Sequence, residues 1–254
     1  MKILLPPSET KRPGGTPGAP EPSAWALPGL LPQRRQVIDA LMALAVDAEA
    51  TRRVLKLSDR QLAEALHDNA RLRTAEVMPA VDRYTGVLYD ALDAATLDGY
   101  ARRWLGAHVL VHSAPFGPVG ALDAIPSYRL GAGASVPALP PLRRLWADAV
   151  SAELTAAAPS FVLDLRSEAY VDLGPVPEGL PSAYVRVVTE QGKALNHFNK
   201  HAKGDFVRRL AQERPKIASR RTLLNWARRV GVELRATEHP GILELVTDQP
   251  TARK

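Results

Sequence analysis

The sequence contains no cysteine, and this absence excludes several kinds of chemistry. Disulfide bonds, thiolate metal sites and cysteine nucleophiles all need a sulfhydryl group. Long apolar runs are also missing, because none approaches the roughly 20 residues of a membrane span. The opening MKILL is stopped by two prolines, so it is too short for the apolar region of a signal peptide. The sequence therefore predicts a soluble, cytoplasmic protein with no membrane partner.

Patterns that hold metals or cofactors are equally scarce. Of the six histidines, only His197 and His201 have i, i+4 spacing, and no HExxH motif accompanies them. The sequence has no P-loop, no GxSxG elbow and no dinucleotide fingerprint. The segment GAGAS at 131–135 has clustered glycines but lacks the fingerprint spacing. We therefore expect neither a bound metal nor a cofactor.

Positive charge is present in excess and is unevenly distributed. The formal net charge is +6, with a sequence pI near 9.7. Residues 193–235, the basic segment, hold twelve Lys/Arg and three acids, which gives +9 there and leaves −3 for the rest of the chain. A localised excess of this kind indicates a polyanionic partner, and a solvated basic face is the alternative.

Short apolar runs alternate with helical patterns along the chain. We expect strands at 2–5, 109–112, 161–165, 183–188, 195–198 and 241–246. We expect helices at 31–48, 49–56, 59–70, 96–108, 141–156, 204–213 and 219–230. This order predicts an α/β (α+β) fold with a mixed central sheet flanked by helices. No repeat or linker interrupts the pattern, so we expect one domain over 1–254, and a monomer is favoured.

Residues 36–72 form a helical hairpin subregion in this interpretation. Two predicted helices meet around Lys56-Leu57-Ser58, where Ser58 has the position of an N-cap and Asp59 lies in the first turn. The pattern predicts a pair of helices joined by a tight turn.

Polar residues follow three of the predicted strands. Ser8 and Lys11 follow the first, Ser113 follows VLVH, and Arg166 and Ser167 follow FVLDL. Ligands of α/β proteins bind where the carboxyl ends of strands meet loops. These residues would line one crevice if the three strands are neighbours, and ordinary loop polarity is the alternative.

Two further features allow two interpretations each. Asp164 lies in an apolar strand and is costly to bury unless it is paired, so it forms an internal ion pair with Arg166 or takes part in catalysis. Gly86, between Tyr84 and Tyr89, permits either a tight turn or a close backbone approach to a ligand.

The stretch NHFNKHAKGDFVRRL at 196–210 combines amide, imidazole and cationic groups around one glycine. If a helix starts near Gly204, its free N–H groups would favour an anion close to Lys200 and Lys203. The alternative is that Asp205 caps this helix and leaves the lysines in water.

Several segments together resemble one known family. They are KILLPPSETK, RYTGVLYDAL, the pattern from Ser113 to Leu130, LWADAV, VLDLRSEAY and HFNKHAKG. They occur in family order over about residues 1–211 and are similar to the YaaA family of peroxide stress proteins. The resemblance implies a single α/β domain, a basic cleft, a helix-hairpin-helix element, and binding of duplex or branched DNA in oxidative stress protection. The predicted helical pair lacks the glycines usual in such hairpins.

The resemblance also implies a set of binding residues. The cleft would draw on Lys11, Tyr84, Ser113, Tyr128, Arg129, Arg166, Ser167, Lys200 and Lys203. The basic stretch itself adds Asn199 and Arg208 as candidates for binding DNA or a nucleotide.

The chain departs from the family pattern in its central loop. Family members commonly read SGLYGVLRPLD, whereas this chain reads SAPFGPVGALD, with Gly120 in place of an arginine. This change favours a second hypothesis, an enzyme acting on a nucleotide, nucleoside or nucleobase as a hydrolase or transferase, including N-glycosidic bond chemistry. Its candidate catalytic residues are Asp164, Ser167 and Lys200, and the sequence assigns no nucleophile or general base.

Overall fold

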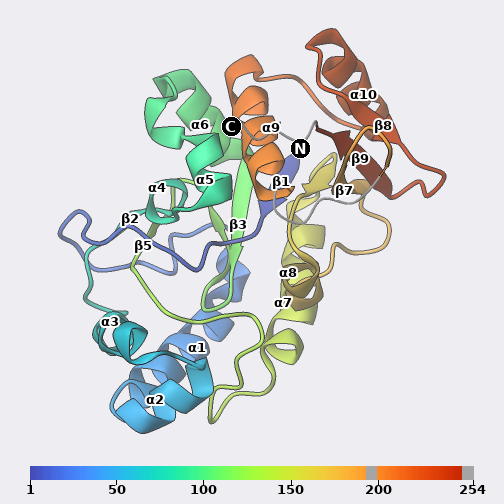
Figure 1. Cartoon of the computed structure of the whole chain (residues 1–254). Helices are drawn as coiled ribbons and strands as arrows, with labels where there is room; N and C mark the ends of the chain where they lie inside the picture. The colour runs from blue at the N-terminus through green and yellow to red at the C-terminus, as the bar shows by residue number, and fades with distance from the viewer. Residues whose placement is uncertain (193–198, 248–254) are drawn as a thin grey trace.

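A seven-stranded sheet crosses the computed structural model, which describes residues 1–192 and 199–247 (Figure 1). Its strand order is β4-β3-β1-β6-β7-β9-β8. The five inner strands run parallel, and the edge strands β4 and β8 pair antiparallel with β3 and β9. The strands are β1 (Lys2–Leu5), β3 (Val109–Ser113), β4 (Gly117–Gly120), β6 (Val162–Asp164), β7 (Ser182–Val188), β8 (Leu234–Ala236) and β9 (Ile242–Val246). The predicted mixed central sheet is confirmed.

The middle of this sheet is apolar because both of its faces are covered. Residues 3–5 of β1 and all of β3 are buried. Parallel strands that are covered on both faces read as continuous apolar runs, as these do. Ile3 pairs with Val109 on one side and with Leu163 on the other. The first strand of the chain therefore lies between two strands that come much later in the sequence.

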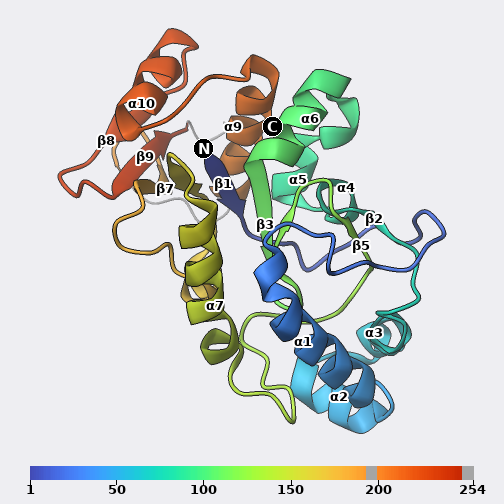
Figure 2. The same cartoon turned by 180° about the vertical axis from the view of Figure 1, so that it is seen from behind.

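Helices cover the two faces of the sheet (Figures 1 and 2). One face carries α5 (Val87–Leu92), α6 (Gly99–His108) and α9 (Asn199–Glu213), and α9 contacts both of the others. The other carries η1 (Pro28–Leu30), α7 (Leu142–Ala157) and α8 (Glu168–Leu173). The remaining short elements are β2 (Met78–Pro79), α4 (Ala80–Arg83), η2 (Ala94–Thr96) and β5 (Ala124–Ile125).

Three helices form a lobe beside the sheet, namely α1 (Leu31–Leu44), α2 (Ala48–Leu55) and α3 (Asp59–Ala70) (Figure 1). The prediction of a helix through residue 48 was wrong at its end. Asp47 has extended backbone and accepts from the N–H of Ala50 (2.9 Å), so it caps the next helix instead of continuing the first. At α3, the N–H of Ser58 donates to Gln61 (3.2 Å), as expected of a capping box.

The chain between β1 and α1 is irregular. Hydrogen bonds from two buried arginines, Arg34 and Arg83, hold it against the rest of the protein. Arg34 on α1 donates to the carbonyl oxygens of Pro22 (3.1 Å), Ala26 (2.6 Å), Phe116 (3.0 Å) and Pro118 (3.0 Å). Burial lowers the pKa of Arg34 to about 10. Backbone dipoles surround this charge, and no carboxylate hydrogen-bonds to its guanidinium within the described residues.

Arg83 on α4 holds the part of this loop that lies nearer to β1. Its guanidinium donates to the carbonyl oxygens of Arg12 (2.6 Å), Gly14 (2.7 Å), Glu76 (3.1 Å) and Ile125 (3.2 Å). One buried side chain thereby joins the loop after β1 to the β2–β5 pair.

Strand β4 was not expected, because its sequence GPVG is typical of a loop. Gly117 has φ of +63°, and a Cβ there would lie 2.9 Å from the Trp146 ring. Gly120 donates its N–H to Asp123 (2.6 Å). The glycines are needed here for close packing, and their local pattern does not reveal this. The strand expected at 195–198 lies outside the described residues.

Candidate functional site

The polar residues that follow three of the strands lie along one edge of the sheet. β1 is the parallel neighbour of both β3 and β6, so the carboxyl ends of all three strands are adjacent. Ser113 ends β3, Arg166 and Ser167 follow β6, and Ser8 and Lys11 lie in the loop after β1. The three strands are thus neighbours, which was the condition for their ends to lie together, and we call this region the strand-end site.

Lys11 occupies the centre of the strand-end site without a carboxylate partner among the described residues. Its Nζ lies 4.1 Å from the centroid of the Tyr128 ring and 5.6 Å from that of Tyr84. It donates to the carbonyl oxygens of Ser8 (3.1 Å) and Glu9 (3.4 Å). Burial lowers the pKa of Lys11 to about 8, although the Glu9 carboxylate opposes this shift. This amine therefore loses its proton at a lower pH than an ordinary lysine does.

The tyrosines beside Lys11 form a hydrogen-bonded pair. The hydroxyl oxygens of Tyr84 and Tyr128 lie 2.8 Å apart, and both side chains are buried. Burial raises the pKa of each phenol, so both stay protonated at neutral pH. Tyr89 donates to the carbonyl oxygen of Pro6 (2.7 Å) and stacks near Tyr84. The site thus offers uncharged hydroxyl groups and aromatic faces rather than phenolates.

A recess of about 170 Å³ opens beside Lys11 and faces helix α3. Tyr128 and Arg129 line it from the sheet side, and Glu64 and Asp68 line it from α3. Arg129 also forms an ion pair with Glu9 (3.3 Å). The recess is smaller than the roughly 300 to 1,000 Å³ of pockets for drug-sized ligands. Its lining combines two cations, Lys11 and Arg129, with the carboxylates of Glu9, Glu64 and Asp68.

Arg166 is fully buried, and its donors are used within the protein. It makes a paired contact with Asp164 (2.9 and 2.6 Å) and donates to His112 Nδ1 (2.7 Å). It also donates to the carbonyl oxygens of Tyr170 (3.1 Å) and Gly174 (2.8 Å). The internal ion pair considered as the alternative to catalysis is present. Arg166 therefore fixes the end of β6 against α8, and each of its three guanidinium nitrogens already donates to a group of the protein.

His112 is a buried residue of this network, and no motif in the sequence singles it out. Arg166 is always a donor, so His112 Nδ1 accepts and the ring proton lies on Nε2. Burial and the Arg166 charge keep the pKa of His112 well below its usual value. The imidazole is neutral, and within the described residues its Nε2 has no hydrogen-bond partner.

Lys203 is a second lysine near the strand ends, on the other side of Asp164. It is 4 % exposed, and its Nζ lies 3.5 Å from the carbonyl oxygen of Arg166 and 5.5 Å from the Tyr184 ring. Burial lowers the pKa of Lys203 to about 8, with partial compensation from the Asp164 charge. Lys11, which is partly buried, and Lys203, which is buried, thus flank the strand ends.

The prediction of a helix starting near Gly204 was wrong, because α9 begins at Asn199. Gly204 lies inside the helix, where a Cβ would come within 2.2 Å of the Leu88 carbonyl oxygen. The glycine is needed for close contact between α9 and α5 and does not open a phosphate loop. Asp205 is exposed and pairs with His201 (3.1 Å), so it does not cap the helix.

Of the other candidate residues, some are exposed to solvent and one already makes hydrogen bonds within the protein. Lys200 and Ser167 are exposed, and Asn199 is partly buried. Arg208 donates to the carbonyl oxygens of Leu92 (2.9 Å) and Asp93 (2.7 Å), which satisfies the end of α5. A ligand that contacts Arg208 would have to replace these bonds.

The altered central loop is buried and does not line the recess. Every residue from 113 to 121 is buried. Trp146 donates to the carbonyl oxygen of Ala114 (3.0 Å), and Phe116 packs on Trp25. The family difference at this loop is therefore accommodated by packing in the core.

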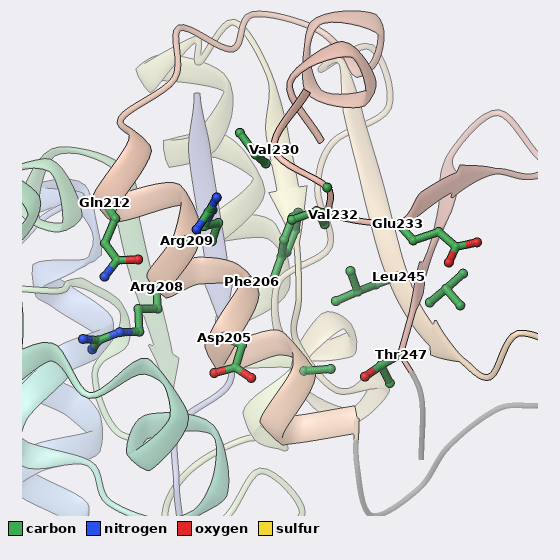
Figure 3. A pocket seen from close by; sticks show the side chains of 13 residues that line it. Asp205, Phe206, Arg208, Arg209, Gln212, Val230, Val232, Glu233, Leu245 and Thr247 are labelled. Atoms are coloured by element: carbon green, nitrogen blue, oxygen red, sulfur yellow. The ribbon is translucent and has the colours of Figure 1, made fainter. Parts of the chain in front are cut away.

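A larger cavity of about 570 Å³ lies between α9 and the β8–β9 end of the sheet. Figure 3 shows Phe206 and Arg209 from α9 on one side, with Val232 and Leu245 on the other. Its floor is apolar and its rim is charged, including Glu233. The sequence does not predict this cavity, because its walls come from three separate segments, residues 202–212, 230–233 and 245–247.

Residues 1–192 and 199–247 contain no grouping typical of a metal site or of a membrane span. No cluster of three or more His, Cys, Asp or Glu residues in that part of the chain could hold a metal ion. No helix there is long and apolar enough to cross a membrane.

The chain is similar to one protein family and to several bacterial proteins. The sequence profile of the peroxide stress protein YaaA family matches residues 1–228. A UPF0246 protein of Corynebacterium glutamicum is 38% identical over 253 residues, covering 97% of this chain and 99% of the relative. A UPF0246 protein of Streptomyces coelicolor is 43% identical over 217 residues, covering 83% and 82%. A UPF0246 protein of Corynebacterium efficiens is 40% identical over 245 residues, covering 94% and 96%.

Proposed function

This chain belongs to the family of the peroxide stress protein YaaA, and on that premise we propose that it binds duplex or branched DNA during peroxide stress. The observation that carries the proposal is the charge distribution. The basic segment has a balance of +9, whereas the rest of the chain has −3. Such a field attracts a polyanion to one part of the surface and speeds its association.

The helical pair α2–α3 offers a second group of cations. Arg53, Lys56 and Arg60 are exposed around its turn, whereas Arg52 is paired with Asp59 (2.6 Å). Lys56 has φ of +53°, a conformation that favours glycine. The side chains around this turn, more than its backbone, are therefore suited to contact phosphates.

A salt series tests the proposal. Fluorescence anisotropy with a labelled duplex and a four-way junction gives the binding constant at each salt concentration. We expect the log–log slope to be about −0.9 for each phosphate that the protein neutralises. Binding that is micromolar or weaker, with no dependence on salt, would contradict DNA binding. The variant Arg53→Gln/Arg60→Gln shows whether the helical pair contributes to the slope.

A second candidate function is favoured by Lys11 and its surroundings. A partly buried amine with a pKa of about 8, two protonated phenols and a recess of about 170 Å³ exceed what backbone binding needs. These groups suit an enzyme that acts on a nucleotide, nucleoside or nucleobase. Lys11 and Arg129 would stabilise negative charge. Asp164 is bound to Arg166, so it acts by positioning and not as a free base.

A panel of nucleotides, nucleosides and nucleobases tests this second function. Turnover read by mass spectrometry, or a thermal shift that is lost in Lys11→Met, would support it. A panel that gives neither turnover nor a thermal shift would exclude these ligand classes as substrates.

A further inference from the structure

The cations of the basic segment differ in whether the fold already uses them. On α9, Lys203 is buried, Arg208 binds carbonyl oxygens, and Arg209 pairs with Glu213 (3.5 Å). Arg214 pairs with Asp98 and Arg235 with Glu233. Most of the cations on α9 and near β8 are therefore already bound within the fold, and Lys200 is the exposed exception on α9.

Helix α10 (Arg220–Arg229) differs from α9 because three of its arginines are not used by the fold. Arg221, Arg228 and Arg229 are exposed, and their guanidinium groups make no hydrogen bond or ion pair within the described residues. No acidic residue occurs between Arg214 and Val232. These three side chains keep all their donors available for a partner.

The helical repeat gathers the free arginines on one face of α10. The opposite, buried face consists of Leu223, Trp226 and Ala227. Arg221 and Arg228 are seven residues apart on the outer face, a rise of about 10.5 Å along the axis. Arg229 borders that face, and a shallow hollow of about 480 Å³ runs beside it toward β8.

The body of the protein holds this helix in place. Trp226 packs against Phe206 of α9, with ring centroids 6.0 Å apart. Arg220 donates to the carbonyl oxygen of Pro240 (2.8 Å). The Oγ of Ser219 accepts from the N–H of Thr222 (3.2 Å), so the helix start is already capped. An anion would therefore bind along the side of the helix and not at its N-terminus.

Helix α10 also lies at a corner of the molecule in both views of the chain (Figures 1 and 2). A long rigid partner can approach this corner. The outer face exposes no large apolar side chain, because Leu224 is partly buried, so it has little to insert into a lipid surface. Guanidinium groups match the geometry of phosphate oxygens with two parallel hydrogen bonds.

We propose that the outer face of α10 contacts the sugar–phosphate backbone of duplex DNA through Arg221, Arg228 and Arg229. This assignment rests on the proposed DNA-binding function and names the surface that carries it. The contacts are to phosphates, so they are independent of base sequence. They lie outside the strand-end site and add to any contacts made there.

The test compares matched variants in the anisotropy assay over about 50 to 200 mM salt. The variant Arg221→Gln/Arg228→Gln/Arg229→Gln is expected to lower the magnitude of the slope by about 0.9 for each lost contact. The variant with lysine at the same three positions should keep most of the slope. Arg143→Gln/Arg144→Gln on α7 is the control, since both residues are exposed and unpaired within the described part of the chain.

The outcomes separate the two proposals. A slope that falls in the glutamine variant, and not in the lysine variant or the α7 control, supports the α10 surface. If the unaltered chain binds with a steep slope and the glutamine variant keeps it, the α10 assignment is wrong while DNA binding stands. If the unaltered chain shows no salt-dependent binding, both proposals are overturned. Far-ultraviolet circular dichroism and melting temperature establish that each variant is folded.

Discussion

At the scale of single residues, Lys203 carries a charge that the fold holds at a cost. It is buried, and its pKa is lowered to about 8. Below pH 8 the amine is charged in both the folded and the unfolded chain, so the burial cost is present in full. Between pH 8 and 10.5 the folded chain loses this proton first, so the cost falls and stability rises.

Lys203→Met should therefore be more stable than the unaltered chain at pH 7. The difference should shrink as the pH rises from 8 toward 10, because the unaltered chain loses the buried charge over that range. Urea unfolding at several pH values measures both curves. The exposed Lys200→Met is the control and should show a constant difference. A gap between Lys203→Met and the unaltered chain that stays constant with pH would contradict the lowered pKa.

Gly204 is expected to tolerate no side chain. A Cβ at this position would lie 2.2 Å from a carbonyl oxygen of Leu88, which cannot rotate away. Gly204→Ala should therefore lower the free energy of unfolding by about 1 to 3 kcal/mol through overpacking between α9 and α5. Urea unfolding measures the change. Gly133→Ala, with no atom within 4 Å of the added Cβ, should stay within about 0.5 kcal/mol of the unaltered chain.

Lys56 has a side chain at a position where the backbone conformation favours glycine. Its φ of +53° is a left-handed conformation that costs about 1 to 2 kcal/mol for a residue with a Cβ. Lys56→Gly should raise the free energy of unfolding by about 1 kcal/mol, measured by urea or thermal unfolding. Lys56→Ala removes the charge and keeps the Cβ, so it should give no such gain. Equal effects of the two changes would show that charge, and not backbone strain, is responsible.

At the scale of elements, Arg83 determines whether the loop after β1 stays in place. Its four carbonyl acceptors belong to the loop, to the segment before β2, and to β5. Arg83→Met leaves these oxygens buried without a donor, at about 1 to 3 kcal/mol for each group that water cannot reach.

Hydrogen exchange followed by mass spectrometry checks this prediction. Peptides covering residues 11–16 and 76–79 should exchange faster in Arg83→Met than in the unaltered chain. Peptides from β7 and β9, on the far side of the sheet, serve as the internal reference. Faster exchange across the whole chain would indicate general destabilisation and would contradict a local role.

Elements also show what the sequence can and cannot predict. The apolar runs of β1, β3 and β6 and the polar residues after them are local signals, so both the strands and the shared strand-end site could be predicted. The start of α9 could not, because the role of Gly204 depends on Leu88 of another helix. The fold of GPVG as β4 depends likewise on the Trp146 ring.

The candidate binding residues also divide into those whose place could be predicted from the sequence and those whose role could not. Lys11, Tyr84, Tyr128 and Arg129 do come together around one recess or its wall. The committed state of Arg166 and Arg208 follows from carbonyl oxygens that no sequence pattern reveals. A cation count therefore overestimates the charge available to a ligand, because the fold uses several cations itself.

At the scale of the whole molecule, the order of the strands determines when the sheet can form. Lys2–Leu5 leaves the ribosome before both of the strands that it pairs with, residues 109–111 and 162–164. At about 5 to 20 residues per second, the first of these partners emerges roughly 5 to 20 s later. During that interval both edges of the KILL segment are unpaired, and the two prolines after it disfavour pairing beyond Leu5. A strand that lies between β3 and β6 in the finished sheet is thus exposed to premature pairing until residues 109–111 have been made.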